Sequence, residues 1–352
     1  MLRSLYSGIS GMKVNQTKLD VIGNNIANVG TTAFKSARVR FEDMLSQNVS
    51  QALAAGVNQG GLNPRQVGLG VQLAGIDTMV SQGMMQPTSR NLDAAIDGDG
   101  YFMVGTGPLP ATNNGGVALN NHIVDTANNT SAINLSYTRD GSFTLDSQGN
   151  LLTTDGYRVM GYAVNNGTAG ALNSVDYNGS VATINFVDAN DAANPPKANE
   201  ATLVPLVIPD SVVTSPAVPG PPPVPATTMR IQSFSIGKDG TISAVLENGS
   251  VSVLGQIAMS SFKNPAGLTK LGKNLYSESA NSGVATIRSG LASAKDNSKG
   301  YGDMLQGMLE MSNVDLAEQF TDMIVSSRAF QANTKTITTG DEILQDILNL
   351  KR

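Results

Sequence analysis

The sequence predicts a mainly β fold with terminal α-helices, in which N- and C-terminal coiled-coil helices flank antiparallel β domains. Apolar side chains recur with a 3.5-residue period over residues 1–30 and again over residues 312–352. Between them, short alternating β-branched segments are separated by Asp-Gly and Asn-Gly turns. With 352 residues, the chain is long enough for two or three domains.

The N-terminal helix is expected over residues 1–30. Steps of four and three residues from Met1 follow an apolar stripe, whereas intervening positions such as Lys13 and Asp20 are polar. A stripe this narrow is typical of a helix that packs along another helix. The side chains on it that we predict to mediate self-assembly are Leu5, Met12, Leu19, Ile22 and Ile26.

The C-terminal helix is expected over residues 312–352. Ser312 or Asn313 is predicted to cap it, and Asp315 and Glu318 then lie in the first turns, where the helix dipole favours acids. The same steps of four and three residues give a second stripe. Its predicted self-assembly residues are Leu316, Phe320, Met323, Phe330, Ile337, Leu344 and Leu348.

Neither stripe is expected to order its own helix. The apolar burial that one stripe offers is smaller than the conformational entropy lost when about thirty residues become ordered. We therefore expect both helices to be largely disordered in an isolated molecule and to fold on assembly. The alternative is that they are two surface helices docked on one globular core.

The rest of the chain divides by composition. Residues 70–163 and 229–288 are expected to form a β-rich core, with YTRDGSFTLDSQGNLLTTDGY and FSIGKDGTISAVLENGSVSV as either a weak internal repeat or a meander. Residues 31–69 and 289–311 are expected to be extended connectors. Residues 164–228 contain PAVPGPPPVP and are expected to be a short, proline-rich outer insertion, extended and solvent-exposed.

Composition argues against several functions. A net charge of -5 and the absence of a basic cluster argue against a nucleic-acid or anionic-membrane partner. The chain has no cysteine and a single histidine, His122, in an Asn-rich tract, so we expect no metal, no cofactor and no catalytic triad. IDGDGYF lacks the further donors of a calcium loop. We expect no enzyme activity, no membrane insertion and no cleaved signal peptide.

The polar stretch LDVIGNNIANVGTTAFK ends the first helix. Asn and Gly tolerate left-handed backbone and supply hydrogen bonds where a helix ends among neighbours. The stretch also resembles the corresponding part of the bacterial flagellar rod and hook proteins, and this resemblance implies that it forms the exit from the helix into an extended connector. The residues assigned to this connector motif are Asn24, Asn25, Asn28, Gly30, Thr31, Thr32, Phe34 and Lys35.

Five segments together resemble the bacterial flagellar rod and hook proteins: MLRSLYSGISGM, LDVIGNNIANVGTTAFK, NLDAAIDGDGYFMV, YTRDGSFTLDSQGNL and SNVDLAEQFTDMIVSSRAFQANTKTI. The resemblance implies a structural subunit whose terminal helices line the inner tube of a helical homopolymer. It also implies partners among rod, hook-cap and hook–filament junction proteins, and export by the flagellar type III apparatus without a cleaved signal peptide.

Within this family, chain length and the insertion at 164–228 favour a subunit of the flagellar hook, the curved and flexible joint that transmits torque from rod to filament. The first alternative is a subunit of the distal rod, which is a rigid shaft. The second, of another class, is a secreted β-domain enzyme or adhesin with helical ends.

Overall fold

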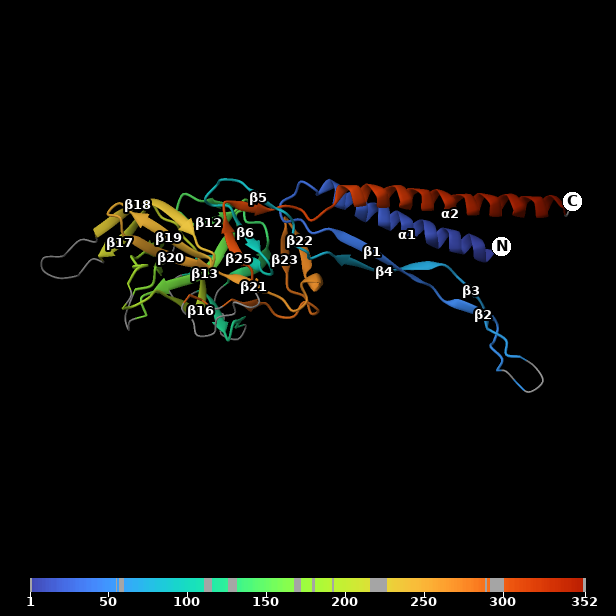
Figure 1. The fold of residues 1–352 in the computed structure, drawn as a ribbon, viewed down its shortest axis with the longest axis horizontal. Coiled ribbons are helices and arrows are strands. Elements are labelled where there is room, and N and C mark those ends of the chain that lie inside the picture. The colour runs from blue at the N-terminus through green and yellow to red at the C-terminus, as the bar shows by residue number, and fades with distance from the viewer. Residues whose placement is uncertain are drawn as a thin grey trace. The chain divides into compact units, whose positions relative to one another are not determined.

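The computed structural model describes residues 2–54, 56, 60–110, 116–125, 132–167, 172–178, 181–191, 193–215, 227–288, 290–291 and 301–350 (Figure 1). The chain divides into two compact units. Unit 1 comprises Met1–Ser81 and Ser312–Arg352, and unit 2 comprises Gln82–Met311. The predicted class is confirmed, because each end of the described chain is helical and the residues between are mostly strands.

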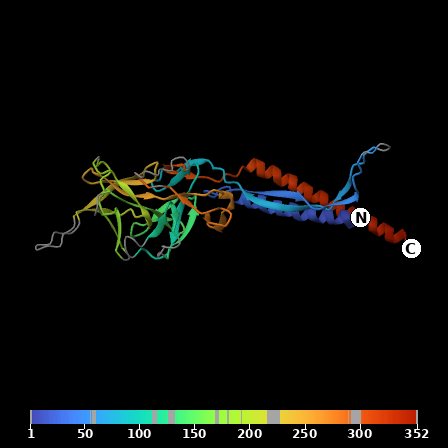
Figure 2. The ribbon, with the colours of Figure 1, turned by 90° about the horizontal axis from the view of Figure 1, so that it is seen from below.

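Unit 1 contains the two helices, α1 (Leu2–Ala27) and α2 (Leu316–Leu350), which pack against each other. A long β-hairpin completes it: β1 (Ala37–Asp43) pairs with β4 (Val71–Thr78), and β2 (Ser46–Ser50) pairs with β3 (Arg65–Gly68). Strands β1 and β4 lie along α1 (Figure 2).

This hairpin differs from the predicted connector at 31–69. Residues 37–50 form its outgoing arm, and the returning arm continues through Thr78. Residues 70–81 therefore belong with the helices. The prediction that they form part of the β core is wrong. The backbone N–H and C=O groups of each arm pair with those of the other, which satisfies their hydrogen bonds.

Unit 2 is built on an antiparallel sheet whose main path runs β17-β18-β19-β20-β13-β7-β10-β23-β22. Its first strands are β5 (Met85–Pro87), β6 (Ala94–Asp97), β7 (Tyr101–Thr106), β8 (Val117–Asn120), β9 (Ile123–Val124), β10 (Asn134–Thr138), β11 (Phe143–Leu145), β12 (Leu151–Thr153) and β13 (Arg158–Asn165). Next come β14 (Val175–Asn178), β15 (Val181–Ile184), β16 (Lys197–Pro205), β17 (Ser211–Ser215), β18 (Thr227–Ile236), β19 (Thr241–Leu246), β20 (Val251–Ile257) and β21 (Met259–Ser261). The last are β22 (Thr269–Gly272), β23 (Leu275–Ser277), β24 (Thr286–Ile287), β25 (Asp303–Gln306) and β26 (Met308–Glu310), with a short 3-10 helix at Pro265–Gly267.

The two similar segments are both meanders. Strands β18, β19 and β20 pair consecutively, as do β11, β12 and β13. Tight turns connect them, and at Asp239 the carboxylate accepts hydrogen bonds from both the backbone and the hydroxyl of Thr241. The following Gly240 has a φ of +83°, a conformation that glycine adopts without strain.

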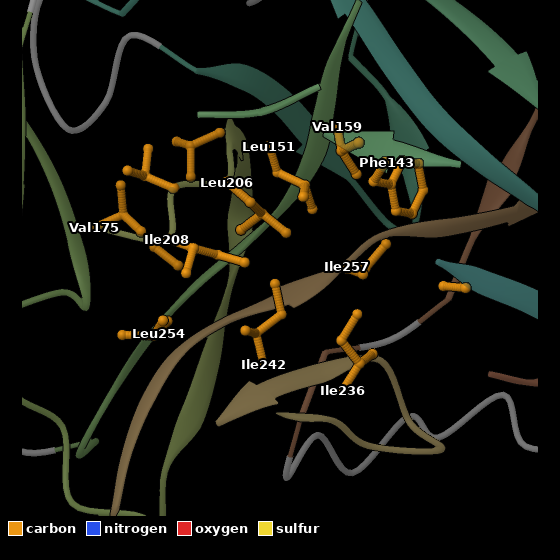
Figure 3. Close-up of a cluster of buried hydrophobic side chains, with 14 of the residues drawn as sticks. Phe143, Leu151, Val159, Val175, Leu206, Ile208, Ile236, Ile242, Leu254 and Ile257 are labelled. Atoms are coloured by element: carbon orange, nitrogen blue, oxygen red, sulfur yellow. The ribbon is translucent and has the colours of Figure 1, made fainter. Parts of the chain in front are cut away.

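The core of unit 2 is a cluster of aliphatic and aromatic side chains contributed by many strands (Figure 3). Phe143, Leu151, Val159 and Ile242 are fully buried in it. The predicted outer insertion contributes as well, because Leu206 lies in the same cluster.

The expectation of an extended insertion at 164–228 is therefore wrong for part of it. Strand β16 pairs with β13, and β17 pairs with β18, so residues 197–215 belong to the main sheet. Their run of aliphatic residues, TLVPLVI, makes burial favourable despite the flanking prolines. The proline-rich tract at 216–226 lies outside the described residues.

The second connector, at 289–311, also differs from the prediction over its described part. Strand β25 pairs with β6, and β26 pairs with β5, so residues 303–310 are strands of unit 2. Residues 289 and 292–300 lie outside the described part of the chain.

Candidate self-assembly surface

Helices α1 and α2 run antiparallel, as the pairs of residues that meet between them show. Near the start of α1, Leu5 lies against Gly340. Near its end, Lys18 forms a salt bridge with Asp322, with 3.4 Å between Nζ and Oδ1. Rising numbers in α1 therefore match falling numbers in α2. The predicted pairing of the two chain ends is present within a single molecule.

Glycines bring the two helices close together. A Cβ atom at Gly8 would lie 3.1 Å from Thr336 Oγ1 and 3.2 Å from Ile337 Cγ1. At Gly11 it would lie 2.6 Å from Asn333 Nδ2. An alanine at Gly8 would therefore require Thr336 and Ile337 to shift by a few tenths of an ångström, and one at Gly11 would require the Asn333 carboxamide to move.

The contact face of α2 alternates apolar and polar or small residues. Its half-buried apolar members are Met323, Phe330, Ile337 and Leu344, all of which we predicted. The positions between them are Gln319, Ser326, Asn333 and Gly340, which are less exposed than their neighbours on either side. We name these eight residues the α2 seam.

Not every residue of the predicted α2 stripe lies on the α2 seam. Phe320 and Leu348 lie outside the α2 seam and are 49% and 68% exposed. Leu316 is spaced in register with Met323 but is 40% exposed, because it lies at the very start of α2. The prediction that these three residues act in self-assembly is untested. All three side chains are exposed in the single chain.

In α1 the predicted residues face inward to different degrees. Ile22 is buried, whereas Leu5, Met12, Leu19 and Ile26 are half-buried. Thr334 Oγ1 of α2 lies 3.4 Å from the Met12 sulfur.

Asn25 is the central residue of the connector motif. It is 1% exposed, and its Oδ1 accepts a hydrogen bond from the Ala37 N–H at 3.0 Å. Its Nδ2 donates to Ala37 O at 2.8 Å and to Gln319 Oε1 at 3.0 Å. A single side chain therefore joins the end of α1, the start of β1 and the first turn of α2.

The next residues of the motif form a turn stabilised by local hydrogen bonds. Asn28 Nδ2 donates to the backbone and side-chain oxygens of Asn24, and Thr31 Oγ1 donates to Asn28 Oδ1. Thr32 is half-buried. The left-handed residue of this turn is Ala33, with a φ of +55°. The expectation that an asparagine or Gly30 has this conformation is wrong.

Phe34 and Lys35 connect the motif to the start of α2. The carbonyl of Phe34 accepts a hydrogen bond from the Asn313 N–H at 3.3 Å. Lys35 is buried and donates from Nζ to Ser81 O at 2.8 Å, and the same oxygen accepts from Asn313 Nδ2 at 3.1 Å. Asn313 also accepts from the Ser36 N–H through Oδ1. It therefore joins three segments that are distant in sequence.

The N-cap of α2 is Asp315, not Ser312 or Asn313. Its Oδ1 accepts from the N–H groups of Ala317 and Glu318, at 2.8 and 3.3 Å. Asn313, whose position in sequence suggested a cap, uses its carboxamide for the contacts described above. Lys351 and Arg352, whose positive charges are favoured near the C-terminal end of a helix, lie outside the described residues.

The described residues contain neither a membrane-spanning helix nor a cluster of metal ligands. In the described part of the chain, no helix is both long and apolar enough to span a membrane. Within the same residues, no group of three or more His, Asp or Glu side chains is arranged to hold a metal ion. The feature that unit 1 does offer is a helix pair with many exposed apolar side chains.

Known protein families match most of this architecture. The model of the flagella basal body rod protein matches residues 5–35, and that of the flagellar basal body rod FlgEFG protein C-terminal matches residues 305–350. The flagellar hook protein FlgE/F/G D1 domain matches residues 124–244. The flagellar basal-body rod protein FlgG of Bacillus subtilis is 42% identical over 352 residues, covering 100% of both chains. The chain belongs to the flagellar rod and hook protein family.

Relatives within the flagellar rod and hook family carry two names. The flagellar hook protein FlgE of Borreliella burgdorferi is 32% identical, and the basal-body rod protein FlgG of the same organism is also 32% identical, each covering 100% of both chains. Among solved structures, the Helicobacter pylori flagellar hook protein FlgE2 aligns at 12% identity with a TM-score of 0.36, covering 64% of this chain and 100% of that chain. That score is too low to support an argument.

Proposed function

We propose that this protein is a structural subunit of the flagellar hook that self-assembles into a curved, flexible helical tube. The observation that carries the proposal is the antiparallel pair of terminal helices, which leaves large apolar side chains such as Phe320 and Ile324 exposed on α2. Exposed apolar side chains along a helix favour burial against neighbouring molecules. An interface that joins two different patches generates an open helical polymer when its rotation does not close into a ring.

In this proposal the two units have different tasks. The helices of unit 1 hold the tube together, and the polar surfaces of unit 2 slide past those of neighbouring subunits as the tube bends and rotates. Charged residues make up only 14% of the sequence, so few ion pairs between subunits would oppose a change of register. The proposal involves no enzyme activity, cofactor, nucleic acid or membrane insertion.

The proposed localisation is the hook outside the cell, reached through the flagellar type III export apparatus. The proposed partners are further copies of this chain and the rod, hook-cap and hook–filament junction proteins. Export requires an unfolded chain, and the absence of cysteine suits this route because no disulfide has to form after export.

A subunit of the distal rod is the second candidate, and one observation favours it. The 42% identical relative is named a rod protein, and its alignment of 352 positions contains no residue without a counterpart in this chain. The alignment with the Borreliella hook protein extends over 473 residues, so 121 of its positions have no counterpart in these 352 residues. The insertion favours the hook, and its residues 197–215 are folded into unit 2.

Electron microscopy of the purified full chain after polymerisation tests the proposal. Curved tubes are expected for a hook subunit, whereas exclusively straight tubes would support the distal rod. A chain that stays monomeric under all polymerising conditions would contradict both and favour the secreted enzyme or adhesin. Limited proteolysis of the monomer is a second test, and we expect rapid trimming of both helical ends around a resistant β core.

A further inference from the structure

The end of helix α2 extends beyond the part of α1 that covers it. Gly340 lies against Leu5, close to the first residue of α1. Residues 341–350 follow in α2 and correspond to roughly 15 Å of helix at 1.5 Å per residue. Figure 1 shows this part of α2 running past α1.

The uncovered end of α2 remains apolar on the side of the seam. Ile347 continues the alternation of the α2 seam after Leu344, and Ile343 and Leu348 flank it. All three are exposed, at 50% for Ile343, 46% for Ile347 and 68% for Leu348. An interface established inside the molecule therefore continues on the same helix with no covering partner. We name Ile343, Ile347 and Leu348 the α2 tip.

A separate apolar groove lies beside the face of α1 that packs on α2. It has a volume of about 410 Å³ and is lined by Tyr6, Ile9, Ser10, Lys13, Met44 and Leu69. This volume is within the range of binding clefts, roughly 300–1,000 Å³. Tyr6, Ile9 and Lys13 follow one another at helical spacing, one position away from Leu5, Gly8 and Met12, which face α2.

Backbone contacts hold the two sides of the groove in place. The Met44 N–H donates to Gly70 O at 2.9 Å, and the Leu69 N–H donates to Leu45 O at 3.2 Å. Ser10 of α1 meets the hairpin where the Val71 N–H approaches its Oγ at 3.4 Å. The groove is therefore formed by paired strands resting on a helix, and not by a loose loop.

We propose that the α2 tip of one copy docks into this groove on another copy of the chain. The inference rests on the proposed function, since it specifies one contact of the polymer. The molecule's own α2 lies on the face of α1 that contains Leu5 and Gly8, so the α2 tip cannot fill the groove of its own chain.

Charge and symmetry support a second copy as the occupant. Lys13 is exposed at the groove, and the exposed carboxylates Asp341 and Asp346 flank the α2 tip. The docked arrangement therefore joins apolar surfaces with opposite charges at their margin. Because tip and groove are different patches, the contact is head-to-tail, and it repeats along an open helix when its rotation does not close into a ring.

Cross-linking tests this contact directly, because the sequence contains no cysteine of its own. Tyr6→Cys copies and affinity-tagged Leu348→Cys copies are mixed, polymerised and oxidised. A disulfide requires Cα atoms within about 7 Å, so a mixed dimer reports contact between two molecules. We expect mixed dimers in the polymer and none in dilute monomer. The matched control, Asn349→Cys, lies at least about 100° round the helix from each residue of the α2 tip and is expected to give at least about tenfold less product.

The outcomes separate this inference from the proposed function. A polymer that forms with no mixed dimer, with equal product from Asn349→Cys, or with mainly Leu348-to-Leu348 dimers would overturn the docking contact while leaving the polymer proposal intact. A wild-type chain that never polymerises would instead contradict the proposed function.

A charge exchange provides the second test. Lys13→Glu and Asp346→Lys are each expected to raise the critical concentration for polymerisation about threefold or more. Combined in one chain they are expected to restore it to near the wild-type value. If the double variant is as impaired as the sum of the two single variants, the contact is overturned.

Discussion

The carboxamide of Asn25 pairs with the backbone of Ala37 in both directions, accepting from its N–H at 3.0 Å and donating to its C=O at 2.8 Å. The side chain thus takes the place of a neighbouring strand at the first residue of β1. Because Asn25 also donates to Gln319 of α2, the turn between α1 and the hairpin is tied to both helices. This arrangement explains why so polar a sequence follows a helix near a chain end.

Replacement of Asn25 by alanine is expected to loosen this junction. The N–H and C=O of Ala37, a half-buried residue, would lose their partners, at a cost of about 1–3 kcal/mol. Hydrogen–deuterium exchange at the Ala37 amide in the polymer should then accelerate by roughly 5- to 100-fold. Asn24→Ala is the control, because Asn24 is exposed and its side chain contacts only Asn28 through the described bonds. Equal acceleration in both variants would contradict the role of Asn25.

A leucine at Gly11 is expected to separate the helices. The Cβ position at Gly11 is already 2.6 Å from the side chain of Asn333, so a larger side chain has to displace α2 at a cost of about 1–3 kcal/mol. At Gly23 of the same helix, no atom lies within 4 Å of that position. Gly23→Leu should therefore stabilise α1 by up to about 1 kcal/mol through helix propensity. The thermal midpoint of the helical circular dichroism measures both, and the same sign of shift for the two variants would refute the close packing.

Sequence periodicity predicted both helices, but only half of the face on α2. Met323, Phe330, Ile337 and Leu344 were found because they are apolar. Ser326 and Asn333 were missed because they are polar, whereas the predicted stripe was defined by apolar residues. Asn333 faces inward opposite Gly11, where the absence of a side chain on α1 leaves room for its carboxamide. Glycines at helical spacing in α1, such as Gly8 and Gly11, were the sequence signal that could have predicted this close helix contact.

The β elements illustrate a different limit. Alternation predicted strands in unit 2, and they form, but residues 37–50 read as a connector because their partner strand lies beyond a long hairpin tip. Pairing between segments distant in sequence is decided by tertiary context. The left-handed residue at Ala33 was missed for a similar reason, since alanine carries no turn signal and its φ is imposed by the contacts around it.

The buried pair between Arg139 and Glu310 is expected to be important for the stability of unit 2. Arg139 Nη1 lies 3.2 Å from Glu310 Oε2, both side chains are buried, and Arg139 Nη2 also donates to Gly98 O at 2.7 Å. Glu310→Gln leaves the guanidinium without its counter-charge, so we expect a loss of about 3–5 kcal/mol. Denaturant unfolding of the β signal measures this loss. The exposed pair Lys273–Asp155 is the control, and Lys273→Gln should change stability by about 0–1 kcal/mol.

Buried tyrosines are expected to make unit 2 unstable in alkali. Burial raises the pKa of Tyr101 to about 12, although Arg139 opposes the rise. Burial likewise raises the pKa values of Tyr137, Tyr162, Tyr177 and Tyr276. A raised pKa favours the neutral form in the folded state, so this contribution is complete below about pH 10 and is lost as the pH rises further.

Tyrosinate absorbance and circular dichroism, followed together in a pH titration, test this expectation. We expect most of the tyrosinate signal to appear in one cooperative step that coincides with loss of the sheet. A gradual rise while the sheet remains intact would show that these phenols reach water in the folded state.

An aspartate at Phe320 should separate folding from assembly. Phe320 is half-exposed on α2 outside the α2 seam, so a carboxylate there meets water in the single chain and leaves unit 2 unchanged. In a polymer that covers this face, the same carboxylate would lose its hydration without gaining a partner, which is strongly unfavourable. Phe320→Asp is therefore expected to abolish pelletable polymer, and Phe320→Leu, which keeps an apolar side chain, should retain it. Leu19→Asp, on the half-buried face of α1, should also abolish polymer while the β signal of unit 2 persists. If Phe320→Asp polymerises at the wild-type critical concentration, this face of α2 lies outside the subunit contacts.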